Sequence, residues 1–363
     1  MVRTTRVRLD RIASATRNLR LSPEVIVGDE IVPAEGYALA VRILTDKSTY
    51  NTVEDVSGRM MALRSGDVLA GVLGIRRALR GYAGDVPPHI AVGDTIEVLN
   101  LGGILGRCTS SNPDIGPPFK AEVLGAILSF PDLGDRIGKP ATIRENAVPA
   151  AEVLEARLPV VYVAGTCMNA GKTVAATELV RGLARAGQRV AAVKLTGVSL
   201  MRDTLSMLDA GAVSALTFND AGLASTHPGT TVAVARGLLN RLAADRVARP
   251  DLVIAELGDG ILGEYGVQDI LLAADLTAVA AAFVVAAPDP VACWGAKQLF
   301  DHRFRQPVTV FTGPATDNEV GRDYIRGELK LPAHNALRDA ASLVEVARQA
   351  VEDWRSRNPG VAA

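Results

Sequence analysis

An apolar stretch that leads directly into a glycine-lysine-threonine loop constrains the fold of this chain more than any other feature. Residues 160–164 are predicted to form a buried strand, and the loop after them ends in Gly171-Lys172-Thr173, where a helix is expected to begin. Backbone N–H groups of such a loop converge on phosphate, and the dipole of the following helix favours the same negative charge. The order of strand, loop and helix therefore predicts a nucleotide-binding P-loop rather than a chance tripeptide.

The loop also predicts roles for individual residues. Lys172 is expected to pair with the β- and γ-phosphates and to act in catalysis, and the hydroxyl of Thr173 is expected to bind Mg²⁺. A glycine at position 171 lets the backbone approach the phosphates closely. The common spacing places the leading glycine at position 166, whereas here it lies one position earlier. The predicted nucleotide-binding residues are Gly165, Thr166, Asn169, Ala170, Gly171, Lys172 and Thr173.

Strands and helices alternate along the rest of the C-terminal part, residues 151–363. Continuous apolar runs are typical of strands that are buried on both faces of a sheet. This pattern predicts an α/β fold with a doubly wound, mostly parallel P-loop NTPase sheet. The expected strands are 160–164, 189–195, 252–257, 281–287 and 308–311, and the expected helices are 172–186, 231–245, 290–300, 318–327 and 337–355.

Residues 1–150 differ in pattern and predict a smaller β-rich, barrel-like domain. Their short apolar runs are separated by Gly, Pro, Asp and Asn, and a linker at about 147–157 leads into the P-loop strand. Six of the first twenty residues are arginines, among them Arg3, which resembles a targeting segment. The alternation of residues 5–9 favours a first strand instead.

Composition excludes several classes of function. The 363 residues carry a formal net charge of −1, which argues against a general nucleic-acid or membrane-surface binder. No apolar run is long and uniform enough to cross a bilayer. The three cysteines lie far apart, so they predict no metal framework and fit a reducing cytoplasm.

Two acidic residues are candidate Mg²⁺ ligands. Glu256 closes an apolar strand just before a glycine-rich turn, as a metal ligand beside bound phosphates would. The alternative is that Glu256 solvates the end of its strand. Asp203 comes shortly after the second expected strand, 189–195, and its alternative is a helix N-cap. Asp259, in the turn after Glu256, is a weaker candidate because aspartate is common in turns.

Lys194 lies inside the apolar strand 189–195, where a lysine is costly unless its amine reaches solvent or an anion. We expect Lys194 to act in catalysis by binding a carboxylate, carbamate or phosphate of an anionic small-molecule substrate. The alternative is an edge position from which the amine reaches water.

The order of these residues resembles dethiobiotin synthetase over about residues 158–330. The matching positions are Gly165-Thr166, Gly171-Lys172-Thr173, Val193-Lys194, Arg202-Asp203, Ser225-Thr226-His227 and Ile254-Ala255-Glu256. The resemblance implies ATP and Mg²⁺ as cofactors. It implies that Lys172 and Thr173 bind phosphate and Mg²⁺, that Asp203 and Glu256 complete the metal site, and that Lys194 faces the substrate.

The departures from that family concern its substrate and its base contact. Cys167-Met168 and Leu195-Thr196 replace residues that cradle the family's diamine substrate, so that particular substrate is not implied. In the segment 312–318, where the family contacts the base, Asn318 or Thr312 is expected to read adenine. A helix N-cap explains Asn318 equally well. No Asn-Lys-x-Asp string, the usual mark of guanine specificity, occurs in the chain.

We therefore expect a cytoplasmic homodimer that uses Mg·ATP to activate a carboxylate or carbamate for amide or ring formation. The alternatives are a nucleotide-switched cofactor-delivery or regulatory ATPase and a small-molecule kinase. In the N-terminal domain, the three arginines of 74–82 and the glycine-rich loop 100–112 are candidates for binding the anionic substrate. Their alternative is that both are solvated barrel loops.

Overall fold

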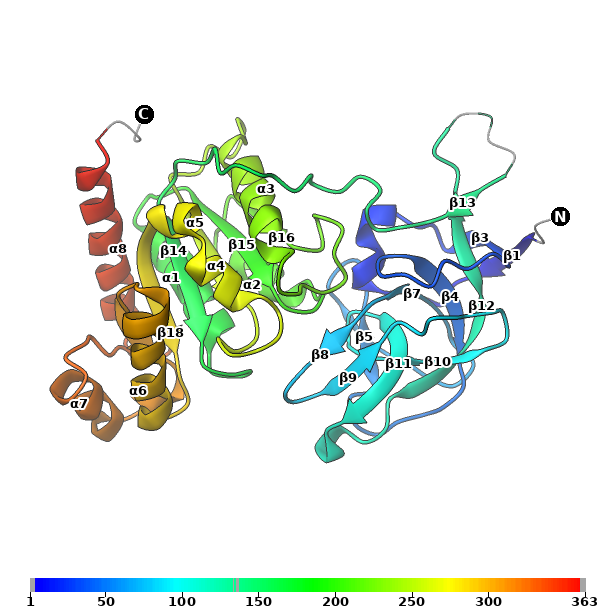
Figure 1. Cartoon of the computed structure of the whole chain (residues 1–363), viewed down its shortest axis with the longest axis horizontal. Helices are drawn as coiled ribbons and strands as arrows, with labels where there is room; N and C mark the ends of the chain where they lie inside the picture. The colour runs from blue at the N-terminus through cyan, green and yellow to red at the C-terminus, as the bar shows by residue number, and fades with distance from the viewer. Residues whose placement is uncertain (1–3, 133, 135–136, 360–363) are drawn as a thin grey trace. The chain divides into compact units, whose positions relative to one another are not determined.

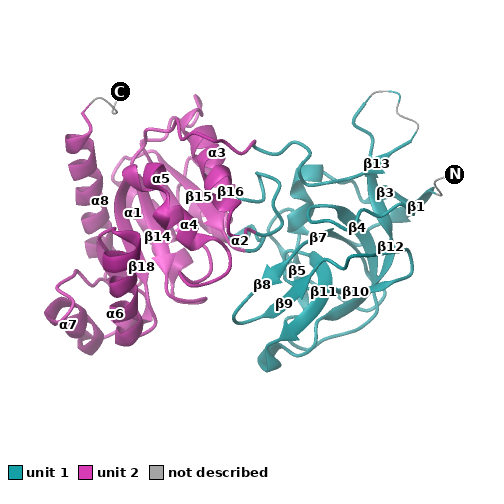
Figure 2. Ribbon diagram, viewed as in Figure 1, with its two compact units in different colours: residues 1–148, 198–202, 218–225 teal, residues 149–197, 203–217, 226–363 magenta. Residues whose placement is uncertain are grey.

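The computed structural model describes residues 4–132, 134 and 137–359 of the chain (Figure 1). These residues form two compact units (Figure 2). Unit 1 consists of the chain up to Val148 together with two later segments, Val198–Arg202 and Phe218–Ser225. Unit 2 consists of Pro149–Gly197, Asp203–Thr217 and the chain from Thr226 onward.

Unit 1 is a β-rich unit whose strands pair mostly antiparallel. Strand pairings run from β12 to β4, β7, β11, β10 and back to β12, which closes a ring. Leucine, isoleucine and valine side chains from these strands fill the inside of the ring, as expected for a small barrel. The elements are β1 (Thr4–Arg8), β2 (Arg11–Ile12), η1 (Ser14–Leu19), β3 (Glu24–Gly28), β4 (Ala38–Ile43), β5 (Thr52–Glu54), β6 (Met60–Ala62), β7 (Val68–Leu73), β8 (Arg76–Arg77), β9 (Tyr82–Asp85), β10 (Thr95–Val98), β11 (Ile104–Ser111), η2 (Pro113–Ile115), β12 (Phe119–Ser129) and β13 (Lys139–Pro140).

The two later segments belong to unit 1 through buried hydrogen bonds as well as packing. The Asn100 amide donates to the carbonyl of Ser199 at 2.8 Å, and the Ser225 hydroxyl donates to the carbonyl of Ile75 at 2.6 Å. Asp220 forms an ion pair with Arg17. Unit 1 is therefore completed by residues that lie in sequence among the strands of the other unit.

Unit 2 is a parallel six-stranded sheet with the strand order β16-β15-β17-β14-β18-β19. Its strands are continuous apolar runs because helices cover both faces. On one face Val161 and Val163 pack with residues of α1 and α8. On the other face Tyr162 stacks on Phe283. The elements are β14 (Val160–Gly165), α1 (Lys172–Arg185), β15 (Val190–Thr196), α2 (Arg202–Asp209), β16 (Ser214–Thr217), α3 (Thr231–Ala243), β17 (Leu252–Leu257), α4 (Val267–Leu272), α5 (Ala274–Ala278), β18 (Ala280–Ala286), α6 (Pro290–Leu299), η3 (Phe300–Phe304), β19 (Val310–Thr312), η4 (Pro314–Thr316), α7 (Glu319–Gly327) and α8 (Ala340–Arg357).

The predicted fold class, an α/β P-loop sheet preceded by a β-rich region, is confirmed. Each expected strand and helix of the C-terminal part is present, with ends that differ by no more than a few residues. Strand β16 and helices α2, α4 and α5 were not predicted, and each is only four to eight residues long. The expected first strand at 5–9 corresponds to β1, whereas Arg3 lies outside the described residues. Within the described residues, no helix combines the length and the apolar character needed to cross a membrane.

Candidate nucleotide-binding site

The P-loop lies at the carboxyl edge of the unit 2 sheet, where the strand order reverses. Strand β14 lies between β17 and β18. The chain leaves β14 for β15 and β16 on one side and later returns to β18 and β19 on the other. Open α/β sheets bind ligands at the carboxyl ends of the strands at this reversal. The topology therefore places the loop 166–171 where a ligand is expected.

The backbone of the loop has the shape that phosphate binding requires. Asn169 and Gly171 have positive φ angles of 60° and 98°, so the loop curls back before helix α1 begins. No side chain caps the start of α1, because its N-cap residue is Gly171. The first N–H groups of a helix have no intrahelical partners, and here they remain available to an anion.

Lys172 folds back over the start of the loop. Its Nζ donates to the carbonyl of Cys167 at 2.7 Å. A Cβ at Gly165 would lie 2.7 Å from Cγ of Lys172, so the leading glycine makes room for this lysine. Burial lowers the pKa of Lys172, and the nearby charges of Glu256 and Asp259 oppose that effect. The lysine thus contacts the loop that it is predicted to serve.

Thr173 and Glu256 meet at the end of the neighbouring strand. The Thr173 hydroxyl donates to Oε1 of Glu256 at 3.0 Å. Glu256 is only 2% exposed, so it does not solvate the end of its strand, and that alternative is wrong. Burial raises the pKa of Glu256 to about 7, with a further contribution from the charge of Asp203, while Lys194 and Lys172 act in the opposite direction.

The donor atoms at this point fit a magnesium ion. Oε2 of Glu256 is buried and has no hydrogen-bond partner within the described part of the chain. An unsatisfied carboxylate oxygen beside a threonine hydroxyl is a ligand set that Mg²⁺ accepts, with phosphate and water oxygens completing the octahedron. The described residues contain no cluster of three or more His, Cys, Asp and Glu side chains suited to a metal. A cation would therefore depend on few side chains, Thr173 and Glu256 among them, together with the bound nucleotide.

Lys194 forms an ion pair with Asp203 beside this carboxylate. Strand β15 lies between β16 and β17, and Lys194 is 7% exposed, so the alternative of an edge position is wrong. In the pairing of β15 with β17, Lys194 is directly opposite Glu256. Asp203 lies in the first turn of α2, after the helix has begun at Arg202, and its carboxylate contacts the amine of Lys194. Both residues were candidates from the sequence, but their pairing was not predicted.

The turn after β17 packs directly against the P-loop. The backbone N–H of Ile261 donates to the carbonyl of Gly165 at 2.9 Å. A Cβ at Gly260 would lie 2.7 Å from the carbonyl oxygen of Thr166, and one at Gly258 would lie 2.2 Å from that of Thr196. These glycines, which flank Asp259 in the sequence, are the signal that this turn approaches other backbone closely. The turn brings Asp259 near Lys172, and the charge of Asp259 partly offsets the lowering of the Lys172 pKa by burial.

The segment after β19 also contacts the P-loop. Gly313 has a φ of 87°, and a Cβ there would lie 2.3 Å from the carbonyl oxygen of Ala170. Oδ1 of Asn318 accepts from the backbone N–H of Gly321 at 3.3 Å, so the N-cap alternative for Asn318 is confirmed. Whether Asn318 also reads a base stays a prediction. The buried Thr312 and Thr166 hydroxyls have no hydrogen-bond partner in the described residues.

The two N-terminal strings belong in large part to strands of the β-rich unit. Arg76 is 3% exposed, and its Nη1 donates to the Tyr50 hydroxyl at 3.1 Å. Arg77 forms an ion pair with Asp85. Most of the string 100–112 is strand β11. The alternative of solvated loops is wrong for Arg76, Arg77 and Ile104–Ser111, which belong to paired strands, but it holds for Arg80, which is exposed in a turn.

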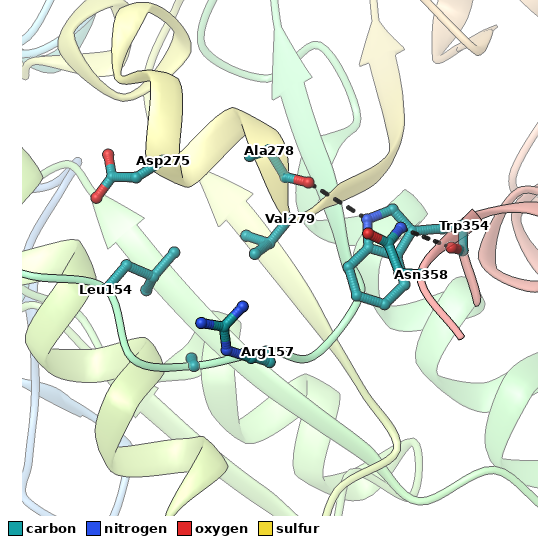
Figure 3. A pocket seen from close by; sticks show the side chains of 8 residues that line it. Leu154, Arg157, Asp275, Ala278, Val279, Trp354 and Asn358 are labelled. Carbon is teal, nitrogen blue, oxygen red and sulfur yellow. Dashed lines mark hydrogen bonds between the residues drawn. The ribbon is translucent and has the colours of Figure 1, made fainter. Parts of the chain in front are cut away.

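A pocket of about 230 Å³ lies elsewhere in unit 2 (Figure 3). Its lining includes Leu154 and Arg157, just before β14, and Val279, just before β18. Trp354 on α8 closes one side, and its Nε1 donates to the carbonyl of Ala278 at 3.4 Å. Because these residues precede their strands, the pocket lies at the amino ends of β14 and β18, away from the P-loop.

Comparisons with known proteins give no close relative. No protein-family model matches the chain. No curated protein matches it. Among solved structures, the signal recognition particle receptor FtsY from Elizabethkingia anophelis is 13% identical, with a TM-score of 0.35 over 56% of this chain and 68% of that chain. A DUF1611 family protein from Anabaena variabilis is 14% identical, with a TM-score of 0.40 over 57% of this chain and 64% of that chain.

HypB from Helicobacter pylori, solved in complex with nickel, is 17% identical, with a TM-score of 0.35 over 55% of this chain and 88% of that chain. Likeness at this level does not assign an activity. The sheet order, the P-loop and the lysine, threonine and glutamate around it are the chain's own evidence that unit 2 has a P-loop NTPase fold.

Proposed function

We propose that this chain is a Mg·ATP-dependent enzyme that activates a small-molecule carboxylate or carbamate as an acyl phosphate. An amine would then attack the activated carbon and form an amide or a ring. The observation that carries the proposal is the buried Lys194, which lies directly opposite Glu256 in the pairing of β15 with β17. Strand β17 is the neighbour of β14, the strand that leads into the P-loop. The resemblance to dethiobiotin synthetase, which has a lysine, an aspartate and a glutamate in this order, supports the same reaction class.

The proposed reaction divides the work among the residues of the site. The loop N–H groups and Lys172 bind the phosphates, and Thr173, Glu256 and Asp203 are the proposed ligands of Mg²⁺. That ion would neutralise negative charge on the γ-phosphoryl group during its transfer. A substrate carboxylate oxygen attacks the γ-phosphorus and ADP leaves. The amine nitrogen then attacks the acyl carbon, loses a proton, and expels phosphate that retains the former carboxylate oxygen.

The ion pair between Lys194 and Asp203 suggests how the substrate would be recognised. Without ligand, Asp203 neutralises Lys194, so the lysine can be buried at a tolerable cost. We propose that the substrate's carboxylate takes the place of Asp203 as partner of Lys194, while Asp203 turns to the cation. The lysine would then orient the attacking oxygen toward the γ-phosphorus.

The test uses substrates labelled with ¹⁸O in the carboxylate. A panel of mono- and dicarboxylic acids, and diamines with bicarbonate as carbamate precursors, is incubated with protein, ATP and Mg²⁺. The proposal expects an acid that stimulates ATP hydrolysis and transfers one ¹⁸O to the released phosphate. Hydroxylamine should trap the acyl phosphate as a hydroxamate. Absence of stimulation by every acid and diamine would contradict the proposal.

Other outcomes of that experiment would favour the alternatives. A phosphorylated product that persists without condensing would indicate a small-molecule kinase. ATP hydrolysis stimulated only by a protein would indicate a nucleotide-switched delivery or regulatory factor. Competition between ATP and GTP for binding tests the expected preference for adenine, and sedimentation velocity tests the expected homodimer. The role of residues 1–150 in substrate choice stays a prediction.

A further inference from the structure

Glu54 is a buried carboxylate in unit 1 that the proposed reaction does not use. It is the last residue of β5, and its side chain has no exposed surface. Its backbone N–H donates to the carbonyl of Leu101 at 2.7 Å, which fixes the residue within the unit. A fully buried carboxylate is costly unless donors satisfy its oxygens. The donors therefore indicate what Glu54 does.

Both oxygens of Glu54 accept backbone N–H groups from the start of helix α2. Oε2 accepts from Met201 at 2.6 Å, and Oε1 accepts from Arg202 at 2.9 Å. The first N–H groups of a helix lack intrahelical partners, and negative charge is favourable at this end. Glu54 is distant in sequence from α2, yet it supplies what a local capping residue usually supplies. It thereby fixes where the helix begins.

The helix that Glu54 fixes carries a residue of the candidate site. Asp203 directly follows Arg202 and lies in the first turn of α2. The connection that leads from β15 to this helix is held in unit 1 a second time, because the Asn100 amide donates to the carbonyl of Ser199. Lys194 and Asp203, which form the ion pair, thus lie on either side of a connection that unit 1 anchors.

We propose that Glu54 is a positioning residue, which sets Asp203 against Lys194 by fixing the first residues of α2. The inference rests on the proposed roles of Asp203 and Lys194 in the reaction. If Glu54 merely stabilised unit 1, its loss would reduce stability without a specific effect through Asp203.

The experiment compares Glu54→Gln with Glu145→Gln as a matched control. Glu145 is another carboxylate of unit 1, only partly buried, and it accepts from the backbone N–H of Thr142 and from the Ser129 hydroxyl, both of which lie in unit 1. Glu54→Gln keeps the size of the side chain and replaces one acceptor oxygen with a donor. Glu54→Asp, which keeps the charge and shortens the reach, is the second variant in case the first does not fold.

Two measurements report separately on the stability of the start of α2 and on the activity of the candidate site. Hydrogen exchange of peptides that cover residues 200–209 should become faster in Glu54→Gln than in Glu145→Gln. The kcat of Mg·ATP hydrolysis without added acid, or the affinity for Mg·ATP if basal hydrolysis is undetectable, should fall by about tenfold or more in Glu54→Gln, since small misplacements of reacting groups are costly. The melting temperature of the two variants provides the comparison of general stability.

A double-mutant cycle with Asp203→Asn decides whether the effect passes through Asp203. In the Asp203→Asn background, adding Glu54→Gln should change turnover or affinity by less than about twofold. Equal effects of the two glutamine variants, or multiplicative effects in the cycle, would overturn the inference. The failure of every acid to stimulate the wild-type chain would instead contradict the proposed reaction, while hydrogen exchange and Mg·ATP affinity would still test Glu54.

Discussion

Lys172 is the residue whose role in the site is most directly testable. Its amine contacts a loop carbonyl rather than a carboxylate, and burial lowers its pKa, so the folded chain gains little stability from it. We expect Lys172→Ala to reduce nucleotide turnover by about 100-fold, which corresponds to the loss of one strong charge-assisted contact or two weaker ones. The melting temperature should change little.

Steady-state hydrolysis and thermal unfolding measure both effects. Lys120→Ala is the control, because Lys120 lies exposed on β12 in the other unit. Hydrolysis by Lys172→Ala at the wild-type rate would show that the P-loop assignment is wrong.

Glu256 predicts a pH dependence of stability in metal-free protein. The pKa of an unfolded glutamate is about 4.5, whereas burial raises the pKa of Glu256 to about 7 in the folded chain. Between these values the folded state binds the proton that the unfolded state has lost. The stability contributed by this group is therefore fully present below pH 4.5 and is lost as pH rises to about 7.

Thermal unfolding in the presence of EDTA, recorded from pH 4.5 to 8, tests this sign. Glu256→Gln carries no titrating group and should lack the wild-type decrease in melting temperature across that range. Mg²⁺ with nucleotide should reverse part of the decrease above pH 7, because a cation favours the ionised form. Parallel curves for the two proteins would place the pKa of Glu256 near its ordinary value.

At the scale of residues, the sequence was sufficient to predict which residues lie in the candidate site, but not which of them contact one another. The motif spacing was sufficient to identify Lys172, Thr173 and Glu256, because strand ends and helix starts in a parallel sheet share one edge. The pairing of Lys194 with Asp203 depends on the course of residues 197–202, which no local pattern specifies. Glu54 was missed because its partners are backbone groups, which leave no mark on the side-chain sequence.

At the scale of elements, the backbone of the connection after β19 packs so closely against the P-loop that neither segment has room for an added side chain at the contact. Gly313→Ala would place a Cβ 2.3 Å from the carbonyl oxygen of Ala170 and force an alanine to a φ of 87°. We expect weaker nucleotide binding and a loss of stability of about 1–3 kcal/mol, the usual range for such strain. Calorimetric titration with Mg·ATP and denaturant unfolding measure the two effects.

Gly295→Ala is the matched control for that substitution. Gly295 lies within helix α6, where an added Cβ meets no atom of the described structure within 4 Å. Helix propensity alone should make this variant more stable by about 0.5–1 kcal/mol, with unchanged nucleotide binding. Opposite signs for the two glycine substitutions are the expected result, and equal signs would contradict the close approach at Gly313.

The major elements of unit 2 could be predicted because their apolar runs are long and end at glycine, proline or a charged residue. Strand β16 could not, since Ser214–Thr217 is short and forms the edge of the sheet, where burial is incomplete. The glycine-rich string 100–112 was misread as a loop. Gly103 and Gly106 are there because neighbouring strands and Ala13 leave no room for a side chain.

At the scale of the whole molecule, the interleaving of the two units predicts how a cut chain behaves. A protease site inserted after the exposed Glu152 would divide the chain in the linker. We expect the two fragments to elute together in size-exclusion chromatography, because the second fragment contains two segments of unit 1. Arg17→Ala, which removes the ion pair with Asp220, should lower the urea concentration at which they separate. Separate elution without denaturant would contradict this arrangement.

A boundary drawn once along the sequence cannot describe such an arrangement. The change of pattern near residue 150 reflects where strand-rich sequence gives way to alternating strands and helices. The segments Val198–Arg202 and Phe218–Ser225 are too short to carry a pattern of their own. Their place in unit 1 follows from tertiary hydrogen bonds such as those of Asn100 and Ser225.

The composition of unit 1 also sets an order of events during synthesis of the chain. When residue 148 leaves the ribosome, the β-rich unit still lacks its two later segments, so Arg17 lacks Asp220 and the amide N–H of Asn100 lacks the carbonyl of Ser199. At about 5–20 residues per second, the chain reaches residue 225 only several seconds later. By then β14, α1 and β15 have already been made. The first unit to begin folding is thus completed only after the second has begun.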